Sequence, residues 1–247
     1  MPRADQLLVV SGLAASRTAA QRLIAAGRVR WAGDLVAKPA QEIPSADALA
    51  VAPDPADRYV SRGGRKLAGA LAASGIEVAG KTALDLGQST GGFTDCLLQA
   101  GAARVVGVDV GHGQLHPRLA ADPRVTAFAG INCRRLAAAD LGAALPAGGF
   151  DLIVGDLSFI SLTAVLPVLP ALRAAGGDLL LLVKPQFEVG KRGVGKGGIV
   201  RDPALYGSVE AKLRQAAAEQ NLAVRAWLDS PITGGDGNRE FFIWLNP

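Results

Sequence analysis

Residues 82–95, TALDLGQSTGGFTD, constrain the fold of this chain more than any other stretch, because they predict a strand, a glycine-rich turn and a helix in succession. The apolar run 82–86 carries one carboxylate, Asp85, and is typical of a buried strand in a parallel sheet. Glycines in the turn 87–92 let the backbone approach a ligand closely, and a helix begins near Phe93. This arrangement predicts a nucleotide pocket at the carboxyl edge of a sheet, with Asp85 as a fixed acceptor beside the ligand.

The spacing of the glycines limits which nucleotide such a pocket can bind. The stretch lacks the G-x-G-x-x-G pattern of dinucleotide-binding folds, and no lysine follows the glycines as in a phosphate-binding P-loop. It therefore favours a cofactor without phosphates, such as S-adenosylmethionine. The predicted cofactor contacts in this stretch are Asp85, Gly87, Ser89, Thr90, Gly91, Gly92 and Phe93. The alternative is a tight turn between a strand and a helix that binds nothing.

Strands and helices alternate through the rest of this region. The predicted strands are residues 81–86, 104–109, 125–129, 150–155, 178–183, 223–229 and 240–245. The predicted helices are residues 64–74, 92–100, 114–121, 136–141, 162–174 and 203–220. Helices between successive strands indicate an α/β fold with a doubly wound, Rossmann-like sheet. Because the loop 230–239 contains no helix, the final strand is expected to run antiparallel, in the order typical of seven-stranded class I methyltransferases.

The composition allows one α/β domain and a small second one with a sizeable core, since the chain has 247 residues of which 49% are apolar. Its net charge of +4 permits a polyanionic partner without requiring one. The two cysteines match neither a disulfide scaffold nor a metal site, so we expect a cytoplasmic protein without a metal centre. The N-terminus does not resemble a signal peptide, and no apolar stretch reaches about 18 residues, so no membrane span is expected.

Residues 1–52 are predicted to form a separate α+β domain. Helices are expected at residues 3–12 and 16–26, followed by short strands around a turn at Gly33-Asp34 and a last strand at Val51. Arginines dominate the charge of the second helix and the residues after it. The simplest interpretation of these arginines is a solvated surface.

The residue order of this domain nevertheless resembles a small RNA-binding domain shared by a small-subunit ribosomal protein, many pseudouridine synthases and tyrosyl-tRNA synthetases. The matching positions are Arg3, Gly12-Leu13, Ser16-Arg17, Ala20, Leu23-Ile24, Gly27, Val29, Gly33, Val36 and Lys38-Pro39. The resemblance implies docking on structured RNA, with both helices against the phosphate backbone. The residues expected to contact RNA are Arg3, Arg17, Arg22 and Lys38.

One further basic segment leads into the predicted catalytic domain, residues 63–247, and a second lies within it. The stiff linker 53–62 leads into a helix whose start carries Arg62 and Arg65, which we expect at the rim of an active site in contact with RNA. The loop 190–198, GKRGVGKGG, is interpreted as an RNA clamp. Its candidate contacts are Lys191, Arg192 and Lys196. The alternative for this loop is a disordered connection without a role in binding.

Polar side chains at the ends of the second and third strands complete the predicted cofactor site. Asp109 lies about twenty residues beyond the glycine turn, where an acid can accept hydrogen bonds from both hydroxyls of a ribose. Asn132 follows the third strand and is a candidate for the adenine edge. Both are expected at the same edge of the sheet as the glycine turn, because ligands bind beyond the carboxyl ends of parallel strands.

The later strand ends predict a catalytic group. Asp156 and Lys184 follow two strands, Glu240 begins the last one, and Lys66 joins them from the preceding helix. Two acids and two amines in one small place are costly unless they are used, which favours catalysis. The alternative is a network of salt bridges that closes the edge of the sheet.

Six motifs occur in order along the chain: VSRGGRKL, DLGQSTGGFTD, VGVDVGHGQL, GDLSFISL, VKPQFE and GNREF. Together they resemble the TlyA family of ribosomal RNA 2′-O-methyltransferases, which also carries a haemolysin name. The catalytic part is similar to FtsJ-type ribose methyltransferases, and this implies a Lys-Asp-Lys-Glu tetrad at Lys66, Asp156, Lys184 and Glu240. The resemblance also implies S-adenosylmethionine as cofactor, with Asp156 among its contacts, and a cytidine ribose as substrate. Gln88 departs from the small residue usual in the glycine motif, which bears on how the cofactor packs.

Two other functions compete with this one: a non-catalytic RNA-binding protein on a methyltransferase scaffold, and a membrane-active haemolysin. The intact set of acids with Lys184 argues against the first, and the lack of a long apolar or strongly amphipathic basic segment argues against the second. We expect a monomer that acts on ribosomal RNA or ribosomal subunits. Two roles are open for Lys184: a neutral amine that acts as general base, or a charged group that orients the hydroxyl.

Overall fold

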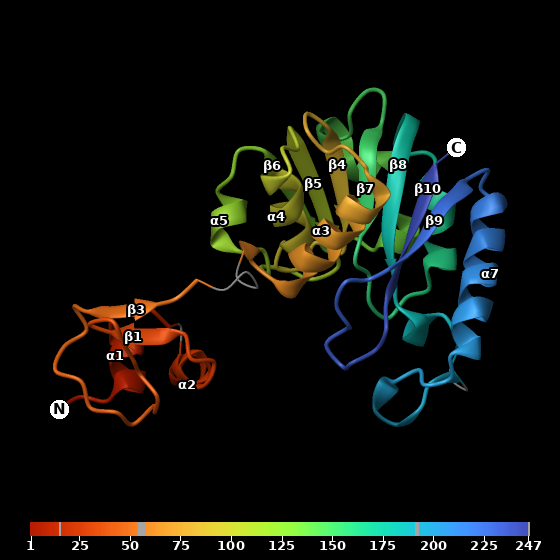
Figure 1. Cartoon of the computed structure of the whole chain (residues 1–247). Helices are drawn as coiled ribbons and strands as arrows, with labels where there is room; N and C mark the ends of the chain where they lie inside the picture. The colour runs from red at the N-terminus through yellow and green to blue at the C-terminus, as the bar shows by residue number, and fades with distance from the viewer. Residues whose placement is uncertain (15, 54–57, 191–192, 247) are drawn as a thin grey trace. The chain divides into compact units, whose positions relative to one another are not determined.

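A computed structural model of the chain describes residues 1–14, 16–53, 58–190 and 193–246. The chain divides into two compact units, Met1–Arg58 and Tyr59–Pro247 (Figure 1). Residues 54–57 of the predicted linker lie outside the described residues.

The smaller unit packs two helices against a three-stranded sheet. Its elements are α1 (Ala4–Val10), α2 (Arg17–Ala25), β1 (Val29–Trp31), β2 (Asp34–Leu35) and β3 (Leu49–Val51). The sheet is antiparallel with the order β2-β1-β3. The predicted turn at Gly33-Asp34 lies one residue earlier, because Ala32 and Gly33 both have positive φ, as a tight hairpin turn requires. Asp34 instead begins β2.

The larger unit is built on a seven-stranded sheet with the order β6-β5-β4-β7-β8-β10-β9. The strands are β4 (Thr82–Leu86), β5 (Arg104–Asp109), β6 (Val125–Ala129), β7 (Phe150–Gly155), β8 (Arg173–Val183), β9 (Ala223–Asp229) and β10 (Phe241–Asn246). Strands β4 to β8 are parallel, and β10 pairs antiparallel with both β8 and β9. The predicted Rossmann-like sheet and its antiparallel final strand are therefore confirmed.

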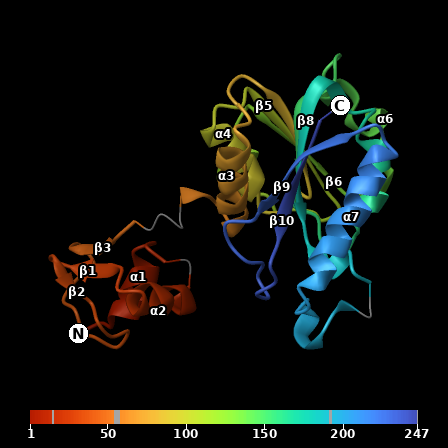
Figure 2. The same cartoon turned by 45° about the vertical axis from the view of Figure 1, so that its right-hand side comes forward.

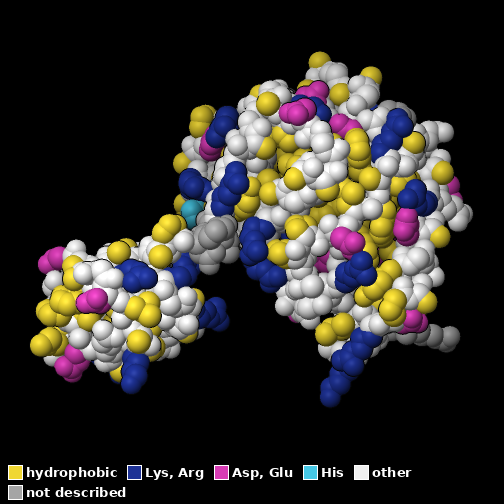
Figure 3. Space-filling model, in the orientation of Figure 1, with side chains coloured by type: hydrophobic (Ala, Val, Ile, Leu, Met, Phe, Trp, Pro, Cys, Tyr) yellow, Lys and Arg dark blue, Asp and Glu magenta, His cyan; other side chains and the backbone are white. Residues whose placement is uncertain are grey.

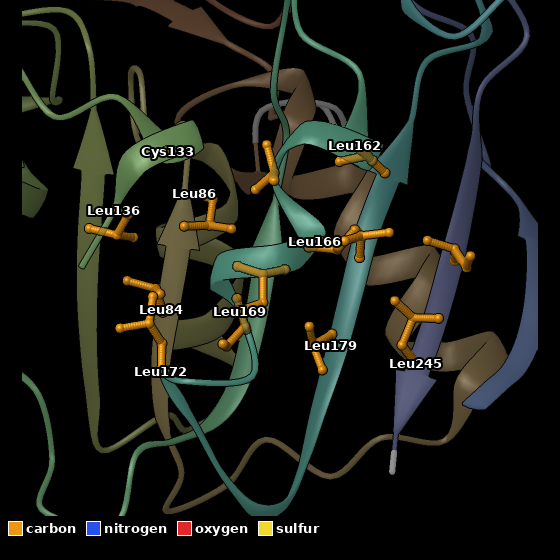
Figure 4. Close-up of a cluster of buried hydrophobic side chains, with 14 of the residues drawn as sticks. Leu84, Leu86, Cys133, Leu136, Leu162, Leu166, Leu169, Leu172, Leu179 and Leu245 are labelled. Carbon is orange, nitrogen blue, oxygen red and sulfur yellow. The ribbon is translucent and has the colours of Figure 1, made fainter. Parts of the chain in front are cut away.

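Both faces of this sheet are buried, which explains the nearly continuous apolar runs of its central strands. Helices α3 (Arg62–Ser74) and α4 (Gly92–Gln99) cover one face, and α7 (Ala204–Ala218) covers the other (Figure 2). Alternate residues of one strand face opposite ways, so Leu84 packs in the cluster on the α7 side and Ala83 in the cluster on the α3 and α4 side. Figure 4 shows leucines of β4, β8 and β10 meeting those of the segment 162–172 on the α7 side.

The predicted helix at residues 162–174 is wrong. The structure has two 3₁₀ turns there, η4 (Leu162–Ala164) and η5 (Leu166–Val168), and β8 already begins at Arg173. Pro167 and Pro170 explain the difference, because each lacks the N–H that a continuous helix needs. Two other predicted helices are shorter than expected and leave only α5 (Pro117–Ala120) and α6 (Ala138–Leu141).

Candidate functional site

The turn after β4 requires glycine at several positions. Gly87 and Gly91 have φ of +77° and +93°, a region that side chains disfavour. A Cβ at Gly87 would lie 2.8 Å from the carbonyl oxygen of Asp156. One at Gly92 would lie 2.2 Å from the Ser61 hydroxyl oxygen, where the start of α3 approaches α4. The turn therefore lies directly against the segment after β7 and against the start of α3.

A cavity of about 620 Å³ opens beside this turn at the carboxyl ends of the strands. Its lining includes Gly87, Ser89, Asp109, Asn132 and Asp156, all predicted to contact the cofactor. The two carboxylate oxygens of Asp109 accept hydrogen bonds of 2.7 Å from the backbone N–H groups of Ser89 and Gly111. These bonds fix the orientation of the carboxylate, and each oxygen keeps a lone pair for a ligand hydroxyl.

A smaller cavity of about 180 Å³ lies against the first. Gly87, Ser89, Asp156 and Ser158 line both cavities, whereas Lys184 lines only the smaller one. The predicted contacts Thr90, Gly92 and Phe93 also line the smaller cavity, and Gly91 lines neither. A ligand in the larger cavity and a group in the smaller one would thus meet at Asp156.

The four candidate catalytic residues form two ion pairs at this edge. Lys184 Nζ lies 2.5 Å from Asp156 Oδ1 and donates to the Ser158 hydroxyl at 2.8 Å. Lys66 Nζ lies 2.6 Å from Glu240 Oε2. Since Val183 pairs with Phe241 across β8 and β10, Lys184 and Glu240 occupy adjacent positions at the sheet edge.

The second of these pairs is deeply buried: Lys66 is 7% exposed and Glu240 is 2% exposed. A charge in such a place depends on its partner. The pair between Lys184 and Asp156 is more accessible and faces the cavities, so it is the one placed to meet a substrate.

Asp85 does not occupy the position predicted for it. Strand alternation directs its side chain beneath the turn, where it is fully buried and lines neither cavity. One of its oxygens accepts from the Thr94 hydroxyl at 2.7 Å, and that hydroxyl accepts from the Gln88 amide at 2.9 Å. Gln88 covers Gly107, where a Cβ would lie 2.0 Å from the Gln88 amide carbon. Asp85 and Gln88 thus support the turn from below. Gln88 also lines the smaller cavity, whereas Asp85 lines neither.

Burial raises the pKa of Asp85 from 3.8 to about 7. Between pH 4 and pH 7 the carboxyl is then protonated in the folded state and ionised in the unfolded state, so stability falls as the pH rises through this window. Asp85→Asn should match the wild type in free energy of unfolding at pH 4 and exceed it by roughly 2–4 kcal/mol at pH 8. Urea denaturation of the cofactor-free protein at both pH values measures this.

The exposed acid Asp229 provides the control for this experiment, because it pairs with Arg239 at the surface. The free energy of unfolding of Asp229→Asn should depend on pH in the same way as that of the wild type. A wild-type protein whose stability is flat between pH 4 and pH 8 would contradict the prediction.

Among the residues near the cavities that were not predicted from the sequence, Ser158, Phe159 and Phe187 form contacts of their own. Ser158 holds Lys184, and Phe159 lines the larger cavity with a side chain that is 91% exposed. Phe159 has a φ of +63°, which is unusual for a bulky residue, and its ring lies 5.1 Å from that of Phe187. The motifs GDLSFISL and VKPQFE contain these residues, but nothing in the sequence shows that the two aromatic rings meet.

The predicted RNA contacts differ in their surroundings. Arg3 and Arg17 both bind the buried carboxylate of Asp5, at 3.0 and 2.9 Å, and the hydrogen bond from Arg3 is the main reason that the pKa of Asp5 is held well below its usual range. Both arginines therefore organise the smaller unit while part of each remains exposed. Arg22 and Lys38 are exposed and have no such partner among the described residues.

In the larger unit, Arg62 donates to the carbonyl oxygen of Thr233 at 2.8 Å, and Arg65 is half-buried. Lys196 is exposed, and the predicted contacts Lys191 and Arg192 lie outside the described residues. On the face shown in Figure 3, Lys and Arg side chains are spread over each unit rather than gathered in one patch.

Two protein families match the chain: the FtsJ-like methyltransferase family over residues 59–247 and the S4 domain over residues 2–49. The 16S/23S rRNA (cytidine-2′-O)-methyltransferase TlyA of Mycobacterium tuberculosis is 47% identical over 246 residues, which cover 98% of this chain and 89% of TlyA. Hemolysin A of Brachyspira hyodysenteriae is 36% identical over 239 residues, 97% of each chain. A solved structure of a hemolysin-named protein from Streptococcus thermophilus superposes with a TM-score of 0.75 at 38% identity, covering 99% of this chain and 88% of the other. Among the described residues, no helix is both long and apolar enough to cross a membrane.

Proposed function

The chain belongs to the FtsJ-like methyltransferase family, and from that premise we propose that it transfers a methyl group from S-adenosylmethionine to a ribose 2′-hydroxyl of a cytidine in ribosomal RNA. The observation that carries this proposal is the pair of adjoining cavities, which share Asp156 and Ser158 and have Lys184 at the smaller one. The relative from Mycobacterium tuberculosis, named for this reaction, supports the choice of substrate. The S4 domain over residues 2–49 supports RNA as the partner.

The residues around the larger cavity suit S-adenosylmethionine. Asp109, held by two backbone N–H groups, would accept from the ribose hydroxyls of the cofactor, and Asn132 would face the adenine edge. The absence of a side chain at Gly87 leaves space next to the backbone of Asp156 that a Cβ would fill. When bound, S-adenosylmethionine supplies an electrophilic methyl group on a positively charged sulfur.

Lys184 would then orient the incoming hydroxyl. An ammonium has three N–H donors, and in this site one faces Asp156 and one faces Ser158, which leaves the third for the substrate oxygen. A charged donor at that oxygen stabilises the negative charge that develops there during transfer. The second oxygen of Asp156 offers an acceptor for the proton that the hydroxyl loses. The buried pair of Lys66 and Glu240 would hold α3 against this edge of the sheet.

The test is methyl transfer by the purified full chain. Labelled S-adenosylmethionine is supplied with 16S rRNA, 23S rRNA, or intact small or large subunits, and the modified nucleotide is mapped by mass spectrometry. We expect a 2′-O-methylcytidine that the Lys184→Ala variant does not form. The proposal is refuted if none of these RNA substrates becomes labelled. Lysis of liposomes by the pure protein without cofactor would favour a haemolysin instead.

Phe159 is expected to stack on a base of the substrate RNA. An exposed aromatic ring beside the reacting groups, held in a disfavoured backbone conformation, indicates a binding role. Phe159→Ala should lower kcat/KM for RNA by roughly 5- to 150-fold, since stacking a base on an aromatic side chain contributes about 1–3 kcal/mol. The melting temperature should not change, because the ring is almost fully exposed.

Phe159→Trp, which keeps an aromatic surface, should retain most of the activity. Val110→Ala is the matched control, because Val110 lines the same cavity and is 68% exposed but has no ring. If Phe159→Ala is as active as Val110→Ala, the ring does not contact the substrate.

A further inference from the structure

Glu188 is a buried carboxylate to which the proposed reaction assigns no role. It follows the short turn η6 (Pro185–Phe187) just after Lys184 and is 7% exposed. Its Oε1 accepts from the backbone N–H of Leu162 at 2.7 Å. Its Oε2 accepts from the Ser161 hydroxyl at 2.6 Å and from Lys212 Nζ of α7 at 2.9 Å.

These bonds join the two segments that carry the candidate catalytic groups. Residues 156–162 follow β7, and residues 184–188 follow β8. At one end the segments are joined by the contacts of Lys184 with Asp156 and Ser158. In the middle they are joined by the rings of Phe159 and Phe187, and at the far end by Glu188.

The backbone of the first segment needs such support. Phe159 has a φ of +63°, and a bulky residue persists in that region only where its surroundings impose it. The segment is fixed on both sides of Phe159: Ser158 is bound to Lys184, and Ser161 and Leu162 are bound to Glu188. Lys212 also donates to the backbone carbonyl oxygen of Glu188 at 3.0 Å, which anchors the second segment to α7.

We propose that Glu188, held by Lys212, is a positioning residue for methyl transfer: it fixes the two segments so that Lys184 and Phe159 face the substrate together. This inference rests on the proposed function, because it concerns the same reaction. Glu188 itself lines neither of the two cavities. Its effect is therefore on the rate of transfer and on the fit of the RNA, while cofactor binding at Asp109 and the glycine turn is unaffected.

The experiment compares Glu188→Ala with Asp178→Ala in the full chain. Asp178 is a matched control, because it is 9% exposed and its carboxylate likewise accepts three hydrogen bonds, in this case from Lys81, Trp244 and Asn246. These partners lie at the amino end of β4 and within or at the end of β10, away from the cavities. Asp178→Ala therefore reports what the loss of a buried carboxylate does to stability alone.

Glu188→Ala should lower the single-turnover rate of methyl transfer by about 10²-fold, the scale expected when reacting groups are misplaced by about 1 Å. The Kd of S-adenosylmethionine should stay within about threefold of wild type, as it should for Asp178→Ala, whose transfer rate should also stay near wild type. Glu188→Gln keeps the acceptor for Leu162 and should recover most of the rate. In a double-mutant cycle, the effects of Glu188→Ala and Phe159→Ala on this rate should be less than additive, because both remove the same platform.

A folded Glu188→Ala variant that transfers methyl groups at the wild-type rate would overturn the inference. So would a loss that matches Asp178→Ala in rate, Kd and melting temperature, because the role would then be structural only. In either case the wild type remains active, so this failure is distinct from failure of the proposed function, in which the wild type itself labels no RNA.

Discussion

Lys184→Ala is expected to lower the rate of methyl transfer by about 10³-fold, the range seen when a charged donor or a proton-transfer group is removed from a reacting centre. The expected change in the Kd of S-adenosylmethionine is less than about threefold, since Lys184 lines only the smaller cavity. The physical reason is that Lys184 is held by Asp156 at 2.5 Å and by Ser158 at 2.8 Å with one N–H left for the substrate oxygen. Single-turnover transfer to rRNA and calorimetry with the cofactor measure the two quantities.

Lys184→Met serves as the control for this experiment, because it keeps most of the side-chain volume and removes only the charge and the donors. It should be as inactive as Lys184→Ala. If either variant loses cofactor binding together with activity, Lys184 supports the fold of the pocket and the assigned role is incorrect.

Glu240→Ala is expected to destabilise the protein by about 3–5 kcal/mol, because it leaves the Lys66 ammonium buried without its partner. Lys66 is 7% exposed and lies 2.6 Å from Glu240, so water does not replace the lost carboxylate. Urea denaturation measures the free energy of unfolding.

The double variant Lys66→Met with Glu240→Leu separates stability from activity. Apolar residues of similar volume commonly replace a buried ion pair without loss of stability, so this variant should unfold near the wild-type midpoint. It should nevertheless transfer methyl groups slowly, if the pair positions α3 at the site. A stable double variant with full activity would show that the pair only closes the edge of the sheet.

Much of the fold could be predicted because its signals are local. The bounds of β5, β6, β7 and β9 match the predicted strands, and the helix-free loop before β10 indicated an antiparallel final strand. The helix predicted at residues 162–174 from its Leu- and Ala-rich pattern does not form, because Pro167 and Pro170 override that pattern.

The site was predictable in position more than in detail. The rule that ligands bind beyond the carboxyl ends of parallel strands placed Asp109, Asp156, Lys184 and Glu240 at one edge, where the structure has them. It misplaced Asp85, because the rule does not consider which way a residue inside the strand points. Ala83, two residues earlier, faces α3 and α4, and alternation places Asp85 on that side as well.

Contacts between distant segments could not be read from the sequence at all. The convergence of Arg3 and Arg17 on Asp5 depends on how α1 packs against α2, and Asp5 lies outside the arginine-rich second helix. The bonds of Glu188 to Ser161, Leu162 and Lys212 likewise join three separate segments. Composition and periodicity do not predict such contacts.

The position of β10 has a consequence for how the protein is made. This strand follows β9 in the chain but lies between β8 and β9, and it brings Glu240 to a lysine that was synthesised 174 residues earlier (240 − 66 = 174). Until residues 240–246 have left the ribosome, β8 has an open edge that can pair with other chains, and Lys66 has no acid beside it. A nascent or truncated chain that stops before residue 240 should therefore be inactive and prone to aggregate.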